Sequence, residues 1–184
     1  VKKRLGFWVG NAIYRHRYHR LCRALGDVPH HLIDQEAIAE AAHPFYHSLS
    51  RGGEGHLEVG KNIYYSTRRG AHMVLSLKPF GCMPSTQSDG VQSAVAARIK
   101  DVLVLPIEPA AEGGLNAHSR VQLVLVEARE RAEAEFDEAL GSTGKTLSQI
   151  RRYVDDHPDL RDPFHHVPEN PGVAGVAANF VLHV

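Results

Sequence analysis

The sequence MVLSLKPFGCMPST occupies residues 73–86 and carries the clearest structural signal of the chain. Residues 73–77 form a short apolar run that ends just before Pro79, which is typical of a buried strand. A tight loop containing Cys82 follows, and the alanine- and valine-rich residues 91–99 predict a helix after it. A second apolar run at residues 102–107 predicts a second buried strand.

A long helix is predicted after the second strand, between about residues 116 and 140, and Gly141 is expected to close it. Its apolar residues recur at helical spacing along one face: Val121, Val124, Leu125, Ala128, Ala132, Phe136 and Ala139. The order strand, helix, strand, helix with apolar strands predicts an α/β, Rossmann-like fold with a mostly parallel sheet flanked by helices. We expect the strands at residues 72–78 and 102–107, and the long helix to pack on their sheet.

Additional helical segments are predicted at both ends of this core. Asn11 is expected to cap a helix that runs to about Leu25 and stops at Gly26. Asp34 is expected to cap a second helix that reaches residue 43, and residues 57–69 predict a third helix closed at residue 70. The tail at 141–184 is helical or irregular, and its last eight residues fit a helix or a strand. Residues 1–184 are thus expected to form a single α/β module, with its core at about 50–140.

Composition narrows the range of partners. The formal net charge is zero, so the long-range field that gathers nucleic acid or anionic membrane is absent. No apolar run is long enough to span a bilayer, and two cysteines in 184 residues do not make a disulfide framework. We expect a cytoplasmic chain with free thiols and with no nucleic-acid or membrane partner. The first residue, Val1, favours a fragment of a longer chain.

Cys82 is the strongest candidate for a functional residue. It lies in the loop that leaves the first strand, and ligands of parallel sheets bind beyond the carboxyl ends of the strands. Pro79, Gly81 and Pro84 restrict the backbone around it, and a nearby helix N-terminus, capped by Ser85 or Thr86, would favour the thiolate needed for metal ligation. A buried cysteine in a tight turn is an equally good reading of the same residues. Cys22, on the apolar face of the first predicted helix, reads as a core residue.

Three further residues are weaker candidates for a site. Glu54 stands between glycines, where it could act as a catalytic or positioning carboxylate or be an exposed turn acid. Asn116 and Arg120 begin the long helix near the same end of the sheet as Cys82. They could bind an anion or hold the loop together.

Two other motifs carry less functional weight. The sequence around Lys145 matches a relaxed phosphate-binding loop, but that loop needs a preceding strand and here the strongest predicted helix precedes it, so we reject ATP binding there. Thr146 and Gln149 instead predict a capping box. Thirteen histidines come mostly in pairs, without the further ligands that a zinc site requires, so a histidine-rich zinc-binding domain is the weakest hypothesis.

Several strings together resemble a known family. They are GEGHLEVGK at residues 53–61, LKPFGCMPST at residues 77–86, Asn116 with Ser119 and Arg120, and the ending GVAGVAANFVLHV at residues 172–184. These are similar to the 2-hydroxyacyl-CoA dehydratase and benzoyl-CoA reductase-type iron–sulfur proteins, above all to their large activase-related members. The resemblance covers residues 50–140 best, and the PFGCMP string is its most specific part.

The resemblance implies that Cys82 is one ligand of an iron–sulfur cluster, of the 4Fe-4S type, in a loop shaped by Pro79, Phe80, Gly81, Met83 and Pro84. The other ligands, ATPase modules and a CoA thioester site would lie in upstream domains of the same polypeptide, which performs ATP-driven one-electron chemistry. The isolated module would carry no cluster and no activity of its own. The alternative is a structural or docking domain that keeps the fold and uses Cys82 only for packing.

Overall fold

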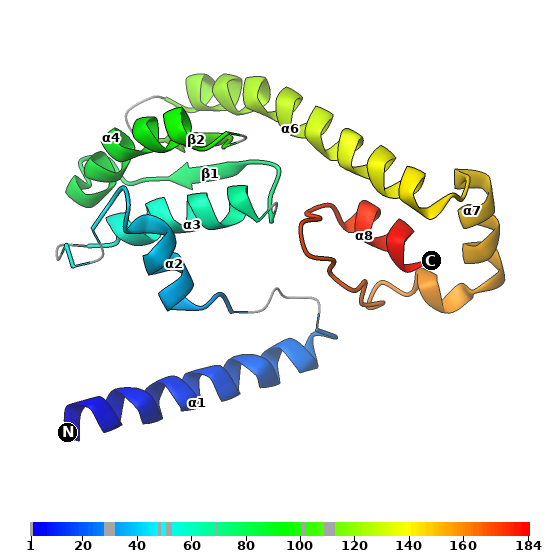
Figure 1. The fold of residues 1–184 in the computed structure, drawn as a ribbon, viewed down its shortest axis with the longest axis horizontal. Coiled ribbons are helices and arrows are strands. Elements are labelled where there is room, and N and C mark those ends of the chain that lie inside the picture. Colours follow the sequence, from blue (N-terminus) through cyan, green and yellow to red (C-terminus); the bar gives the residue numbers. More distant parts are fainter. Residues whose placement is uncertain are drawn as a thin grey trace.

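The computed structural model describes residues 2–27, 32–47, 49–50, 53–68, 70–100, 102–108 and 113–184. The elements follow one another in the order α1 (Lys2–Ala24), α2 (Gln35–Ala42), α3 (Gly55–Thr67), β1 (Val74–Leu77), α4 (Met83–Arg98), β2 (Val104–Ile107), α6 (Gly114–Thr143), α7 (Leu147–Asp156), the 3₁₀ turn η1 (Pro158–Arg161) and α8 (Val176–His183) (Figure 1).

The two strands are parallel and are joined through α4, with Val74 opposite Val104 and Leu77 opposite Ile107. The predicted strand, helix, strand, helix order is therefore confirmed, although both strands are shorter than predicted. The chain is mainly helical, and its described residues form a sheet of two strands. The apolar tail, whose pattern left helix and strand open, forms α8 and adds no strand.

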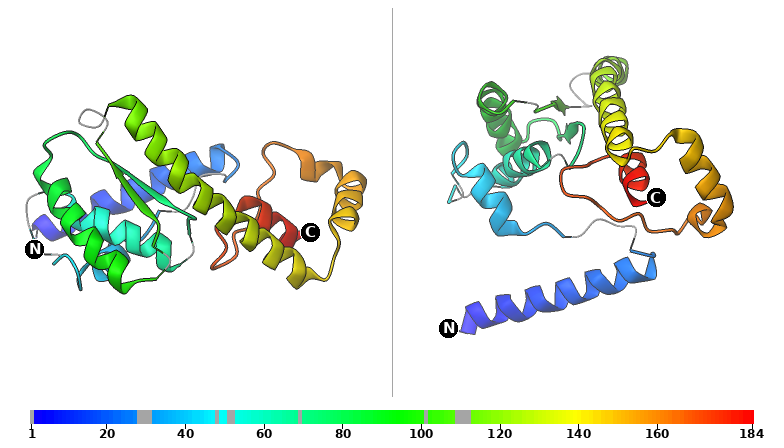
Figure 2. Two further views of the ribbon diagram at one scale, coloured as in Figure 1. Left: turned by 90° about the horizontal axis from the view of Figure 1, so that it is seen from above. Right: turned by 45° about the vertical axis from the view of Figure 1, so that its right-hand side comes forward.

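Helices lie on both sides of this small sheet. In the right-hand view of Figure 2, α3 and α4 lie on one side of the strands and α6 lies on the other. The core between α2, α3 and α4 contains Ala42, Val59, Ile63 and Val95. A Cβ on Gly60 would lie 2.4 Å from the carbonyl oxygen of Ile38, so the close crossing of α2 and α3 requires glycine there.

Several predicted helix ends differ from the structure. Asn11 caps nothing, because α1 begins at Lys2 and Asn11 lies in its interior. Cys82 is itself the N-cap of α4, so neither Ser85 nor Thr86 has the capping role, and proline in the first turn suits the missing N–H partners there. Gly141 lies within α6, which ends at Gly144, since Gly144 adopts the left-handed conformation (φ 66°) that terminates helices.

The long helix α6 touches the sheet with its first part and α8 with its later part. Arg120 reaches the carbonyl oxygen of Pro106 on β2, whereas Glu135 binds the backbone that leads into α8. The predicted apolar face is correct, since Ala128 and Ala139 are buried and Val121 is half-buried. Helix α6 thus contacts the sheet with its first part and the segment leading into α8 with its later part.

One half of a sheet face is uncovered. Leu105 and Ile107 of β2 are buried, yet their partners Leu75 and Leu77 on β1 are 42% and 67% exposed. Paired residues of parallel strands share a face, so an apolar strip on β1 faces outward beside α6. Among the described helices, including the 23-residue α1, none combines the length and apolar character needed to cross a membrane.

Candidate functional site

The loop from Lys78 to Cys82 carries the first candidate site. The backbone N–H of Cys82 donates to the carbonyl of Pro79 at 3.3 Å, and Gly81 has a φ of 70°, a conformation that favours glycine. This tight turn places Cys82 half-buried at the start of the 16-residue α4. Sequence reasoning therefore placed Cys82 correctly, beyond the carboxyl end of β1.

Lys78 holds this loop from the inside. Its side chain is buried, and its ammonium donates to the carbonyl oxygen of Ser85 at 3.2 Å and to the hydroxyl of Ser88 at 3.3 Å. The same ammonium forms an ion pair with Asp89. Three acceptors match the three donor hydrogens of an ammonium. Lys78 thereby ties the end of β1 to the first two turns of α4 across the loop that carries Cys82.

Glu58 on α3 adds a second carboxylate to this cluster. The Ser85 hydroxyl donates to Glu58 Oε1 at 2.9 Å, the Ser88 hydroxyl donates to Oε2, and Oε2 lies 3.7 Å from Lys78 Nζ. The buried ammonium thus faces two carboxylates that keep partial contact with solvent. We refer to Glu58, Lys78, Ser85, Ser88 and Asp89 as the Lys78 cluster.

The Lys78 cluster contains a serine beside a lysine, the composition of a nucleophilic dyad. Ser88, however, has no exposed surface, and both Ser88 and Lys78 are committed to partners inside the fold. A nucleophile must reach its substrate. The cluster therefore has a structural role: it fixes the Cys82 loop to α3 and α4.

Apart from the capping role expected of Ser85, no role was predicted for the residues of the Lys78 cluster. A usable signal was present, because polar residues at 85, 88, 89 and 92 recur at helical spacing on one face of the segment that became α4. Such a polar stripe on a core-facing helix needs buried partners. Gln92 follows the same rule, since it accepts a hydrogen bond from the buried Asn62.

Two apolar residues near Cys82 in the sequence are exposed. Phe80 is 72% exposed and Met83 is 70% exposed. The loop therefore leaves two large apolar side chains open to solvent, one on each side of Cys82 in the sequence. Large exposed apolar groups beside one another mark surfaces that other molecules cover.

The weaker candidates occupy the same end of the fold with different roles. Gly53, next to Glu54, lies directly against Pro84, since a Cβ there would approach the Pro84 ring to 2.4 Å. Glu54 is exposed and makes no side-chain capping bond at the start of α3. Arg120 donates to the carbonyl oxygen of Pro106 at 3.1 Å, which ties α6 to β2, and Asn116 is exposed. The anion-binding and loop-holding roles expected of these two residues stay predictions.

A second polar cluster joins the two halves of the chain. The carboxylate of Glu135 accepts hydrogen bonds from the backbone N–H groups of Ala174 and Gly175 at 2.9 and 2.7 Å, and from His72 Nε2 at 2.9 Å. Burial raises the pKa of Glu135, but the three hydrogen bonds together lower it by more. The pKa of Glu135 therefore lies below its ordinary value. The carboxylate also occupies the N-terminus of α8, where negative charge is favourable.

The described residues supply a single thiol at the Cys82 loop. Cys22 is 3% exposed on α1, in agreement with its core prediction. Within the described ranges there is no group of three or more histidine, cysteine or acidic residues arranged to hold a metal ion. A cubane cluster takes four thiolates, so this part of the chain fits the contribution of one ligand and does not fit a complete site.

The region that resembled a phosphate-binding loop has the predicted helix-stop structure. Helix α6 precedes it, and Thr146 and Gln149 form the predicted capping box at the start of α7. The ammonium of Lys145 donates to the carbonyl oxygen of Val184. Lys145 therefore ties the end of the chain to the α6–α7 junction.

Comparisons with known proteins give no relative: no family model matches the chain, and neither does a curated protein or a solved structure.

Proposed function

We propose that this chain is a module that presents Cys82 as one thiolate ligand of an iron–sulfur cluster shared with other domains of a larger redox protein. The observation that carries the proposal is the placement of a half-buried thiol at the start of α4, beyond the carboxyl end of a parallel strand. The family resemblance of residues 53–61 and 77–86 gives the same assignment. The cluster would supply one-electron transfer, and this chain's part is to hold one ligand.

The rigidity of the loop supports this role. A ligand must keep its position when the metal centre changes charge, which requires partners behind it. The Lys78 cluster provides them, because the ammonium bonds to the first turns of α4 and Glu58 joins those turns to α3. The thiol is thus mounted on rigid elements and not on a free loop.

The open surfaces support a shared site. Leu75 and Leu77 leave one side of β1 uncovered, and Phe80 and Met83 extend the exposed apolar groups to the Cys82 loop. In doubly wound α/β proteins, further strands and helices cover such positions. We propose that neighbouring domains of the same polypeptide, including ATPase modules, complete a wider Rossmann-like sheet here and bring the other cluster ligands.

The second candidate function is a docking domain without a cluster. The exposed Phe80 and Met83 favour it, because a surface that binds another domain through apolar contacts needs no thiolate. Under this alternative, Cys82 only packs in the interface. A CoA thioester substrate and a cytoplasmic location belong to the first proposal.

Anaerobic purification of the longer protein, with iron and sulfide measured, separates the two functions. We expect Cys82→Ala to lose iron and sulfide while the domains stay associated, and Cys22→Ala, the matched control, to keep both. Phe80→Ser with Met83→Ser should weaken domain association. Unchanged iron and sulfide in Cys82→Ala would reject the ligand role and leave the docking role.

A further inference from the structure

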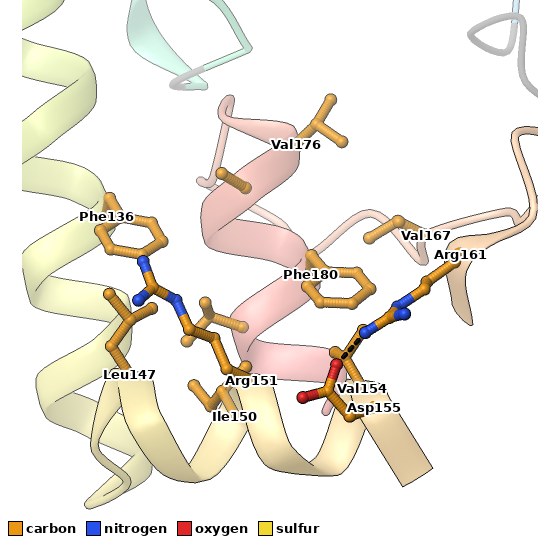
Figure 3. Close-up of a pocket in the computed structure, with 12 residues that line it drawn as sticks. Phe136, Leu147, Ile150, Arg151, Val154, Asp155, Arg161, Val167, Val176 and Phe180 are labelled. Atoms are coloured by element: carbon orange, nitrogen blue, oxygen red, sulfur yellow. Dashed lines mark hydrogen bonds and ion pairs between the residues drawn. The ribbon is translucent and has the colours of Figure 1, made fainter. Parts of the chain in front are cut away.

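An apolar cavity of about 700 Å³, largely open to solvent, lies among α6, α7 and α8. Its walls include Phe136, Leu147, Ile150, Val154, Val176 and Phe180 (Figure 3). Cavities that hold small molecules have volumes of roughly 300–1,000 Å³ and are lined mainly by apolar side chains. By size and lining, this cavity belongs to that class.

The helices around the cavity are held apart by their own connections. The capping box of Thr146 and Gln149 fixes the direction in which α7 leaves α6. At the other end of α7, Arg161 of η1 forms an ion pair with Asp155. Ile150 of α7 is buried, whereas Leu147 of α7 is 38% exposed and Val176 of α8 is 70% exposed. A ligand would remove this apolar surface from water.

The cavity wall carries more positive than negative charge. Three charged residues line it, of which Asp155 and Arg161 neutralise each other. Arg151 extends from α7 toward Phe136 of α6, and within the part of the chain that the structure describes it forms no ion pair. Arg151 is exposed at the edge of this apolar surface. An apolar cavity with one guanidinium that has no ion pair among the described residues is complementary to a molecule with an apolar body and one negative charge.

We propose that this cavity binds a small amphipathic carboxylate, with its aliphatic chain among α6, α7 and α8 and its carboxylate at Arg151. The planar guanidinium donates two parallel hydrogen bonds to a carboxylate, a geometry that lysine cannot offer. The inference is independent of Cys82, since no residue of the cavity wall belongs to the Cys82 loop or the Lys78 cluster.

Titration of the whole chain with octanoate, decanoate and dodecanoate, below their micelle-forming concentrations, tests the class of ligand. We expect saturable binding that tightens about fourfold for each added methylene until the cavity is full, since each buried methylene contributes ~0.8 kcal/mol. Methyl resonances of Ile150, Val154 and Val176 should shift, and those of Val59 and Val95 in the other core should not.

Variants test the role of the charge. Arg151→Gln should weaken decanoate about tenfold and leave decanol unchanged, while Arg152→Gln, on the same helix but outside the cavity wall, should change neither. Ala177→Phe should block all three acids, with Ala134→Phe on α6 as its control. No saturable binding at any chain length, an equal effect of Arg151→Gln and Arg152→Gln, or methyl shifts outside the cavity would each overturn the proposal.

Discussion

Replacement of Lys78 by methionine tests whether the Lys78 cluster holds the site. Methionine keeps most of the apolar stem and removes the ammonium, with its bonds to Ser85, Ser88 and Asp89. Removing one partner of a buried ion pair costs about 3–5 kcal/mol. The Glu58 and Asp89 side chains keep 25% and 34% exposure, so water can partly rehydrate them. We therefore expect a loss of stability at the lower end of this range, ~3 kcal/mol.

Urea unfolding followed by circular dichroism measures this loss. With a slope of about 2 kcal/mol per molar urea, ~3 kcal/mol lowers the midpoint by roughly 1.5 M. Lys61→Met, at an exposed position of α3, is the matched control and should change stability by less than ~0.5 kcal/mol. Adding Asp89→Asn to Lys78→Met should recover part of the loss, because it removes an unpaired carboxylate. A Lys78→Met midpoint equal to that of the control would refute the assigned role.

Three further predictions concern Glu135, Cys82 and Lys145. Because the pKa of Glu135 lies below its ordinary value of 4.5 in the folded chain, its stabilisation is complete above that value and is lost as pH falls through the lowered pKa. Glu135→Gln should thus destabilise the chain by about 1–2 kcal/mol at pH 7 and progressively less in acid, with the exposed Glu133→Gln as control; an equal effect at pH 7 and pH 3 would contradict this. Iodoacetamide should alkylate the half-buried Cys82 faster than Cys22, as mass spectrometry of the folded protein would show, and equal rates would remove the structural basis of the ligand role. ATP with magnesium should give no saturable calorimetric signal, whereas micromolar affinity abolished by Lys145→Ala would overturn the helix-stop reading.

The elements with strong periodicity could be predicted from the sequence. The apolar runs that became β1 and β2 and the apolar face of α6 are encoded locally, because a buried strand or helix face needs contiguous or periodic apolar residues. The capping box of Thr146 and Gln149 is likewise local. Local encoding also explains why Cys82 could be placed in the loop after β1.

Helix ends and long-range polar contacts could not be predicted in the same way. Helix α4 begins at Met83, with Cys82 as its N-cap, although the sequence favoured Ser85 or Thr86 as caps. The bonds of Lys78 to Ser85 and Ser88 exist only when β1 and α4 are already side by side, so no local pattern predicts them. The bonds of Glu135 to Ala174 and Gly175 join residues about forty positions apart, so the spacing of residues along the chain does not predict them. The cavity beside α7 has the same origin, since it arises from the angle between helices.

The location of the uncovered surfaces connects the fold to the proposed function. Leu77 ends β1, Phe80 and Met83 flank Cys82, and all three are more than half exposed. Burying such groups contributes about 25 cal/mol per Å² of apolar surface, so a domain that covers them gains stability at the site where the thiol lies. That domain would exclude water from Cys82 and could supply the remaining ligands from its own side of the contact. The Lys78 cluster then has a clear physical purpose, because a ligand that meets a partner across an interface must hold its position before the partner arrives.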